Sequence, residues 1–153
     1  MRLSLDANVL IYTVQAGDRR QAAALGIVEA AARADCVLTL QALGEFFVVA
    51  ARKGLLERPR AAELVRGWMA VFPTAAATSE AVAAALAESE AGRFSYWDAL
   101  LLATAGRAGC GALVSEDMAE GTSLAGARVV AAFAPGGGVS PGARAVLGLA
   151  AGP

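Results

Sequence analysis

The chain of 153 residues contains no histidine, a single lysine (Lys53) and only two cysteines. The lack of histidine excludes Ser-His-Asp triads, Cys-His dyads, histidine general bases and histidine metal sites. Cys36 and Cys110 lie far apart, which excludes zinc-finger spacing and predicts two buried, reduced thiols. If the protein is an enzyme, then carboxylates, a metal ion or a few hydroxyls must carry out its chemistry.

Long apolar runs are also missing. No uninterrupted apolar stretch approaches the ~18 residues that a membrane span needs, and the N-terminus lacks the charged and apolar regions of a secretory signal. We therefore expect a cytoplasmic protein with no membrane partner. The net charge of −1 indicates no global basic field for polyanions.

Apolar residues are abundant, at 57%, and they fall in alternating strand-like and helix-like segments. Short apolar runs predict strands at 2–5, 36–40, 112–117 and 127–133. Helical spacing and capping residues predict helices at 9–17, 18–34, 41–54, 59–72, 78–92 and 95–109. This alternation predicts an α/β domain with a mainly parallel sheet.

The last twenty residues differ in composition from the rest. Residues 134–153 contain six glycines and three prolines, with Arg144 as their only charge. We therefore expect one domain over residues 1–133, followed by a Gly/Pro/Ala-rich tail that is flexible or becomes ordered on a partner.

Four acidic residues occur in apolar surroundings: Asp6 in "LDANVLIY", Glu45 in "LGEFFVV", Asp98 in "YWDALLLATA" and Asp117 in "LVSEDM". An isolated ionised carboxylate is costly in such surroundings. Three of them have simpler explanations, because Asp6 can cap a helix, Asp98 can form a capping box with Ser95, and Asp117 can end a strand in a turn. Glu45 has no basic residue one helical turn away in either direction.

Considered together, the four acids predict a metal site. The carboxyl ends of parallel strands and the starts of the following helices converge on one crevice, where four carboxylates would repel one another. A bound divalent cation removes this repulsion. Oxygen ligands without His or Cys favour Mg²⁺ or Mn²⁺ over zinc.

These segments, in this order and spacing, resemble the PIN domain, and more narrowly the VapC-like toxins of toxin–antitoxin pairs. The resemblance extends over about residues 1–133 and rests on "LDANVLIY", "LGEFF", "FSYWDALLLATA" and "LVSEDM". It implies a three-layer α/β/α fold whose central sheet has four to five short strands. It also implies a metal-dependent endoribonuclease that cleaves RNA with a metal-activated water.

The resemblance assigns roles to individual residues. It implies that Asp6 and Asp98 are the primary Mg²⁺ ligands, and that Glu45 and Asp117 complete the catalytic cluster. It places Asn8, Ser115 and Glu116 around the ligands, the first two orienting carboxylates and water, and Glu116 supplementing or replacing Asp117. The implied partners are an RNA substrate, a cognate VapB-like antitoxin and a second copy of the chain.

Other interpretations remain open at this point. The same pattern is compatible with a non-toxin PIN nuclease of RNA processing, or with a non-catalytic module that binds RNA or protein. A haloacid-dehalogenase-like phosphotransferase would need a second Asp where Asn8 stands, and a later lysine. A stripe of Trp68, Met69 and Phe72 would suit a dimer interface, and ordinary core packing is its alternative. The basic residues between 52 and 66 are candidates to bind RNA, or are simply solvated.

Overall fold

The structure is a computed structural model that describes residues 1–152. Parallel strands form the centre of the molecule. The four-stranded sheet has the order β1 (Arg2–Leu5), β4 (Cys110–Ser115), β6 (Ala127–Ala131) and β5 (Ser123–Leu124). Only the β5–β6 pairing is antiparallel. A separate parallel pair, β2 (Leu38–Thr39) and β3 (Thr74–Ala75), is linked to β1 by a bridge between Leu3 and Cys36. The predicted mainly parallel α/β fold is confirmed.

The described residues also form seven helices. These are α1 (Ala7–Tyr12), α2 (Gln21–Ala31), α3 (Leu40–Arg52), α4 (Arg58–Val71), α5 (Ser79–Glu90), α6 (Tyr96–Arg107) and α7 (Pro141–Leu147). Side-chain oxygens start several of them: Thr39 accepts from Ala42 N–H at 3.1 Å, and Ser95 accepts from Asp98 N–H at 3.2 Å. Because Thr39 caps α3, the strand expected over 36–40 ends at Thr39, and β2 itself covers only Leu38–Thr39.

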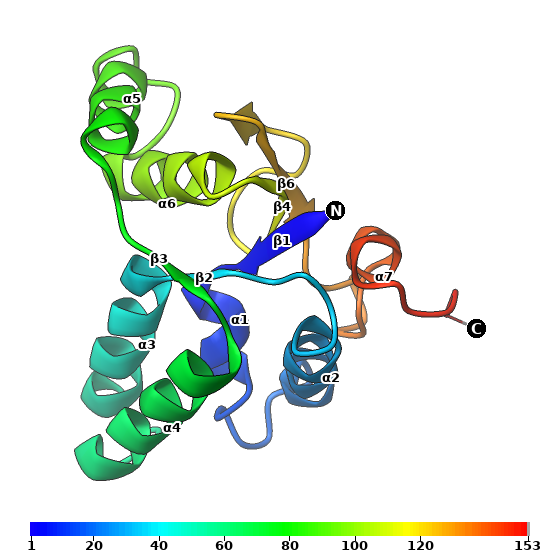
Figure 1. The fold of residues 1–153 in the computed structure, drawn as a ribbon. Coiled ribbons are helices and arrows are strands. Elements are labelled where there is room, and N and C mark those ends of the chain that lie inside the picture. The colour runs from blue at the N-terminus through cyan, green and yellow to red at the C-terminus, as the bar shows by residue number, and fades with distance from the viewer. Residues whose placement is uncertain (153) are drawn as a thin grey trace.

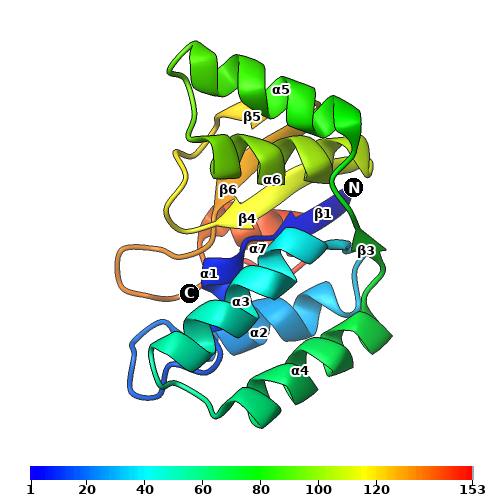
Figure 2. The ribbon, with the colours of Figure 1, turned by 90° about the vertical axis from the view of Figure 1, so that its left-hand side faces the viewer.

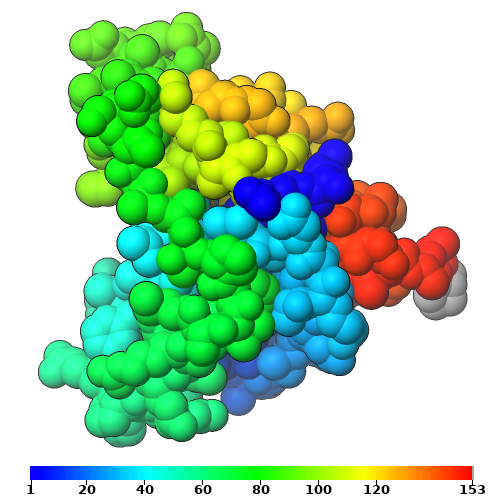
Figure 3. Space-filling view, in the orientation of Figure 1, coloured from blue at the N-terminus to red at the C-terminus, as the bar shows by residue number. Residues whose placement is uncertain are grey.

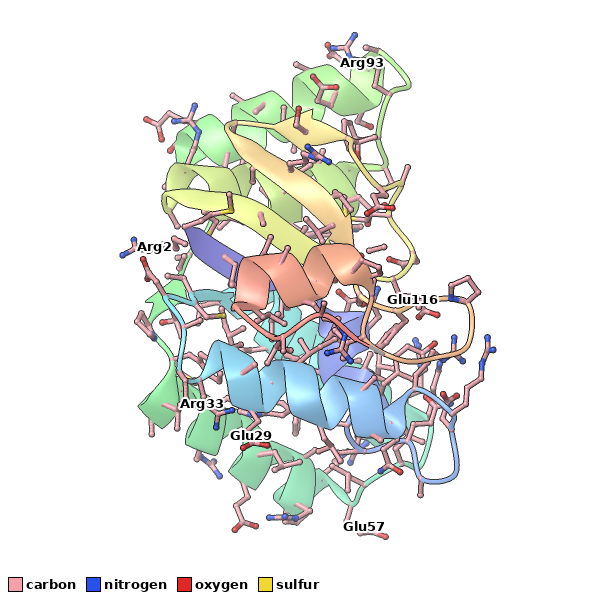
Figure 4. The ribbon with its side chains drawn as sticks, turned by 90° about the vertical axis from the view of Figure 1, so that its right-hand side faces the viewer. Arg2, Glu29, Arg33, Glu57, Arg93 and Glu116 are labelled. Carbon is pink, nitrogen blue, oxygen red and sulfur yellow. The ribbon has the colours of Figure 1, made fainter. Side chains whose placement is uncertain are left out.

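Helices cover both faces of the sheet (Figure 1). In β4 and β6, Leu113 and Val129 face α6, whereas Val114 and Val130 belong to the core beneath the other helices. This alternation follows from the two-residue period of a strand. Figure 2 shows α5 and α6 above α3 and α4, and Figure 4 shows α7 in front of the lower part of the sheet, with α2 below it. The expected three-layer arrangement is therefore present.

The C-terminal segment corrects one expectation. Residues 134–152 do not leave the fold, because α7 packs on β6 and α2, with Ala143 and Leu147 buried. Figure 3 shows the red C-terminal segment against the side of the molecule. Ser140 caps this helix by accepting from Ala143 N–H at 3.0 Å. Gly142 allows the close approach, since a Cβ there would lie 3.0 Å from a methyl group of Val130. Pro153 lies outside the described residues.

The stripe expected on α4 divides between core and surface. Phe72 is buried, and the Trp68 ring meets the Phe46 ring edge to face at 4.7 Å between centroids, which supports ordinary core packing for both. Met69 alone is exposed. Cys36 and Cys110 are buried free thiols, as predicted. None of the helices in residues 1–152 is long and apolar enough to cross a membrane.

Candidate active site

A polar cleft of about 370 Å³ opens at the carboxyl ends of β1 and β4, beside α3 and α6. The four acidic residues singled out in the sequence all line it: Asp6, Glu45, Asp98 and Asp117. Asn8 and Glu116 line it as well, and Ser115 lies at its base, hydrogen-bonded to Asp6. The fold therefore brings the predicted set together from four separate segments of the chain.

Asp6 is the most buried carboxylate of the cleft, with 6% of its surface exposed. Its N–H still donates to Val114 O at 2.9 Å, which continues the β1–β4 ladder, and its extended backbone makes it the N-cap of α1. The carboxylate accepts from Ala7 N–H at 2.7 Å and from Ser115 Oγ at 2.7 Å. The predicted capping role is thus present, together with a position in the cleft.

Asn8 links the two acids that come from the sheet. Its amide nitrogen donates to Asp117 Oδ1 at 2.8 Å and lies 3.4 Å from Asp6 Oδ2. Its amide oxygen accepts from Glu116 N–H at 3.3 Å. Asn8 therefore holds the start of α1 against the loop after β4, in the orienting position expected for it.

The other two acids come from helices. Asp98 lies in the first turn of α6, where Ser95 caps the helix, and Glu45 lies in the second turn of α3. The amide of Gln41 on α3 donates to Trp97 O at 3.0 Å, so the two helices are joined at the rim of the cleft. This link places Glu45 and Asp98 on neighbouring walls.

Burial, together with neighbouring negative charges, disfavours ionisation of Asp6 and Glu45. Burial of Asp6, together with the nearby charges of Asp117 and Glu45, raises its pKa to about 7, although the bonds from Ser115 and Ala7 oppose the shift. Partial burial and the charges of Asp117 and Asp98 raise the pKa of Glu45. A cation in the cleft would relieve the repulsion between these charges.

The oxygen atoms that line the cleft are chemically suited to bind a hard divalent cation. They are carboxylate, amide and hydroxyl oxygens. As they stand in residues 1–152, no three Asp, Glu or Cys side chains are grouped closely enough to hold a metal ion. The carboxylates share the cleft, but their side chains would have to turn toward a common centre to bind a metal ion together.

Glu116 forms an ion pair with an arginine. Arg20, at the N-terminus of α2, forms ion pairs with both Asp18 and Glu116, and its guanidinium lies 4.2 Å from the centroid of the Tyr12 ring. Figure 4 shows Glu116 at the end of the sheet opposite Arg2. This pairing orients the Glu116 carboxylate toward α2, whereas the neighbouring Asp117 carboxylate accepts from Asn8.

Sequence reasoning missed several residues of the cleft wall. Tyr12, Gln15, Gln41 and Trp97 line the cleft but were not among the candidates. The sequence could have indicated Trp97, because it directly precedes Asp98 at the start of a helix and therefore lies near the same cleft. Its exposure to solvent was not evident from the sequence.

The fold and the cleft define an α/β domain with an acidic site at the carboxyl ends of its parallel strands. The family model of the PIN domain matches residues 3–119, so the chain belongs to the PIN domain family. A comparison with curated proteins finds no significant match.

Solved structures of VapC toxins and toxin–antitoxin complexes have similar folds. VapC20 of Mycobacterium tuberculosis, a toxin that cleaves the sarcin–ricin loop, has a TM-score of 0.58 and 19% identity over 72% of this chain and 86% of its own. A toxin–antitoxin complex from Klebsiella pneumoniae has a TM-score of 0.58 and 20% identity over 82% and 94%. DNA-bound VapBC from Salmonella typhimurium has a TM-score of 0.58 and 17% identity over 86% and 98%. At these identities the likeness shows the fold alone.

Proposed function

We propose that the protein is a Mg²⁺-dependent endoribonuclease, with Mn²⁺ as an alternative ion, and that it acts as the toxin of a toxin–antitoxin pair. The observation that carries the proposal is the convergence of Asp6, Glu45, Asp98 and Asp117 on one cleft in a PIN-family chain. The similar folds of VapC toxins support the toxin assignment.

In this proposal the four carboxylates hold the metal, with Asp6 and Asp98 as primary ligands. A bound Mg²⁺ supplies an acidified water and neutralises charge on the phosphodiester. Ser115 and Asn8 fix the orientation of Asp6 and Asp117, which narrows the arrangements those carboxylates can adopt. If water attacks, the products carry 5′-phosphate and 3′-hydroxyl ends, and 2′,3′-cyclic phosphate ends would contradict this step.

Cleavage of a labelled RNA by the purified protein tests the function directly. We expect cleavage with Mg²⁺ or Mn²⁺, none with EDTA, and loss of activity in Asp98→Asn and Asp6→Asn. Glu29→Gln is a matched control, because it removes an acidic charge on the exposed face of α2, away from the cleft. Cleavage that persists in both acid variants would reject the proposed site.

Inducible expression tests the toxin assignment separately. Wild-type protein should arrest growth, and Asp98→Asn should not. Cleavage without growth arrest would favour a non-toxin PIN nuclease, and RNA binding without cleavage would favour a non-catalytic module.

The proposed protein partners are a VapB-like antitoxin and a second copy of the chain. The antitoxin would neutralise the toxin by covering the acidic cleft, for example by presenting an arginine to the carboxylates. Co-expression with a neighbouring small gene should restore growth and yield a complex in which RNA cleavage is inhibited. Light scattering on the purified toxin tests the homodimer.

A further inference from the structure

Trp97 exposes an indole at the edge of the proposed catalytic cleft. It lies in the first turn of α6, directly before Asp98, and 64% of its surface is accessible. It is the only aromatic among the large, exposed hydrophobic side chains of residues 1–152. An indole normally contributes a large buried apolar area, so this exposure calls for an explanation.

The indole is supported from behind rather than loosely attached. The Tyr96 ring meets it edge to face, at 5.0 Å between centroids and 72° between planes, and Tyr96 itself packs on the small core beneath α5 and α6. The backbone carbonyl of Trp97 accepts the 3.0 Å bond from Gln41. The other tryptophan, Trp68, packs on Phe46 and needs no further partner. The Trp97 indole therefore has a fixed support and a free surface.

A second hollow, of about 520 Å³, adjoins the indole and shares Glu45 and Arg52 with the acidic cleft. Apolar parts of α3, including Leu40, Gly44 and Val48, line this hollow. A Cβ built at Gly44 would meet nothing within 4 Å, so the hollow is open there. Its chemistry suits a flat, mostly apolar group.

Two positive charges lie in the same region. Arg52 and Lys53, at the end of α3, line the acidic cleft, and no salt bridge within residues 1–152 involves either of them. Trp97 is bonded to the first turn of α3, and the cations lie at the last turn of the same helix, along the same cleft. An aromatic face and unpaired cations along one groove are the combination that binds single-stranded nucleic acid, since bases stack on the ring and phosphates farther along the strand bind the cations. The bases of a duplex are already stacked and cannot reach an indole.

We propose that Trp97 stacks on an unpaired base of the RNA beside the phosphodiester to be cut, while Arg52 and Lys53 bind backbone phosphates farther along the strand. The inference rests on the proposed ribonuclease function and adds which residues of this chain bind the base and which bind the backbone. It predicts a base-dependent contribution to binding from Trp97 and a base-independent contribution from the two cations.

Titrations in EDTA, where no cleavage is expected, separate these contributions. The probes are a single-stranded oligoribonucleotide, an abasic strand of the same length and a duplex of the same sequence. We expect only the single strand to quench tryptophan fluorescence, and Trp97→Phe, which retains Trp68, to abolish the quenching. Trp97→Ala should weaken binding of the single strand roughly 5- to 150-fold, the range that follows from stacking energies of ~1–3 kcal/mol, and leave the abasic strand unaffected.

Arg52→Ala provides the complementary test. It should weaken binding of the RNA strand and of the abasic strand equally. It should also reduce the slope of log K against log salt concentration by about 0.7 for each phosphate that the arginine neutralises in the wild type. Met69→Ala is the matched control, because Met69 is exposed on α4 and lines neither hollow. Thermal melting checks that each variant is folded.

Unchanged RNA affinity in Trp97→Ala, or no quenching of the wild type, would overturn the inference. So would a change of oligomeric state in Trp97→Ala without a change in RNA affinity, because the indole would then be a protein contact. Cleavage is measured separately with Mg²⁺. Base-dependent binding without cleavage would reject the nuclease function alone, and cleavage unaffected by Trp97→Ala would reject the stacking role alone.

Discussion

Asn8 connects the two carboxylates that the sheet delivers to the cleft. Because its amide donates to Asp117 at 2.8 Å and lies near Asp6, replacing it with Ala should let these acids separate and turn toward solvent. We predict about a 10- to 100-fold loss of RNA cleavage in Asn8→Ala, as for other groups that orient metal ligands. The loss should appear together with a higher Mg²⁺ concentration at half-maximal activity.

Glu29→Gln is the control, since Glu29 is an exposed polar residue of α2 that does not line the cleft. Full activity in Asn8→Ala at ordinary Mg²⁺ concentrations would show that the Asn8 bonds are dispensable.

Asp6 makes the stability of the metal-free protein depend on pH. Its pKa rises from 3.8 in the unfolded chain to about 7 in the fold, chiefly because the carboxyl is buried. Between these values the folded state binds more protons than the unfolded state, so stability falls as pH rises through this window. The loss from Asp6 alone is on the order of a few kcal/mol by pH 8.

Urea denaturation in EDTA at about pH 5 and pH 8 measures this effect. Asp6→Asn cannot ionise at that position, so the fall in unfolding free energy between the two pH values should be smaller in the variant than in the wild type. An equal fall in both proteins would remove Asp6 as the cause.

At the scale of elements, α7 belongs to the core. Leu147 packs with the helices beneath the sheet and is 7% exposed. We predict that Leu147→Ala lowers the free energy of unfolding by roughly 2 kcal/mol or more, as large-to-small changes at buried positions do. Leu86→Ala, on the exposed surface of α5, should change it far less. If chemical denaturation gave the same free energy of unfolding for Leu147→Ala and the wild type, α7 would not contribute to the stability of the fold.

The sequence predicted the longer elements because each carried its own local signal. Helices α5 and α6 begin directly after Thr78 and Ser95, which are good capping residues. The cap of α3, Thr39, was instead expected within a strand. Helix α7 was missed because glycine content dominated the interpretation of the tail. Its boundary signals were nevertheless present, with Ser140 as cap and Gly148 at a left-handed φ of 67° after the last turn.

The acids of the cleft could be predicted for a similar reason. Asp6 follows one predicted strand and Asp117 ends another, and parallel topology brings such positions to one edge. The pairing of Arg20 with Glu116 could not be predicted, because it joins residues 96 positions apart through the geometry of the loop after α1. The exposure of Trp97 likewise depends on how α6 sits against α3, which no local pattern encodes.

At the scale of the whole molecule, metal binding and folding should be linked. A ligand that binds only the folded state raises its stability, and a cation that binds the ionised cleft must displace the proton held by Asp6. With a pKa of about 7, Asp6 is mostly protonated at pH 6 and mostly ionised at pH 8. We therefore predict that Mg²⁺ raises the melting temperature more at pH 8 than at pH 6.

Melting curves with MgCl₂ and with EDTA at the two pH values measure this difference, and NaCl at matched ionic strength controls for general screening. Asp6→Asn should abolish most of the Mg²⁺-dependent increase at pH 8, because it removes the ligand whose proton competes with the ion. Glu29→Gln, on the exposed face of α2 away from the cleft, should retain the increase in full. An increase that is the same at both pH values, or that survives in Asp6→Asn, would place the cation elsewhere on the protein and remove Asp6 from the metal site.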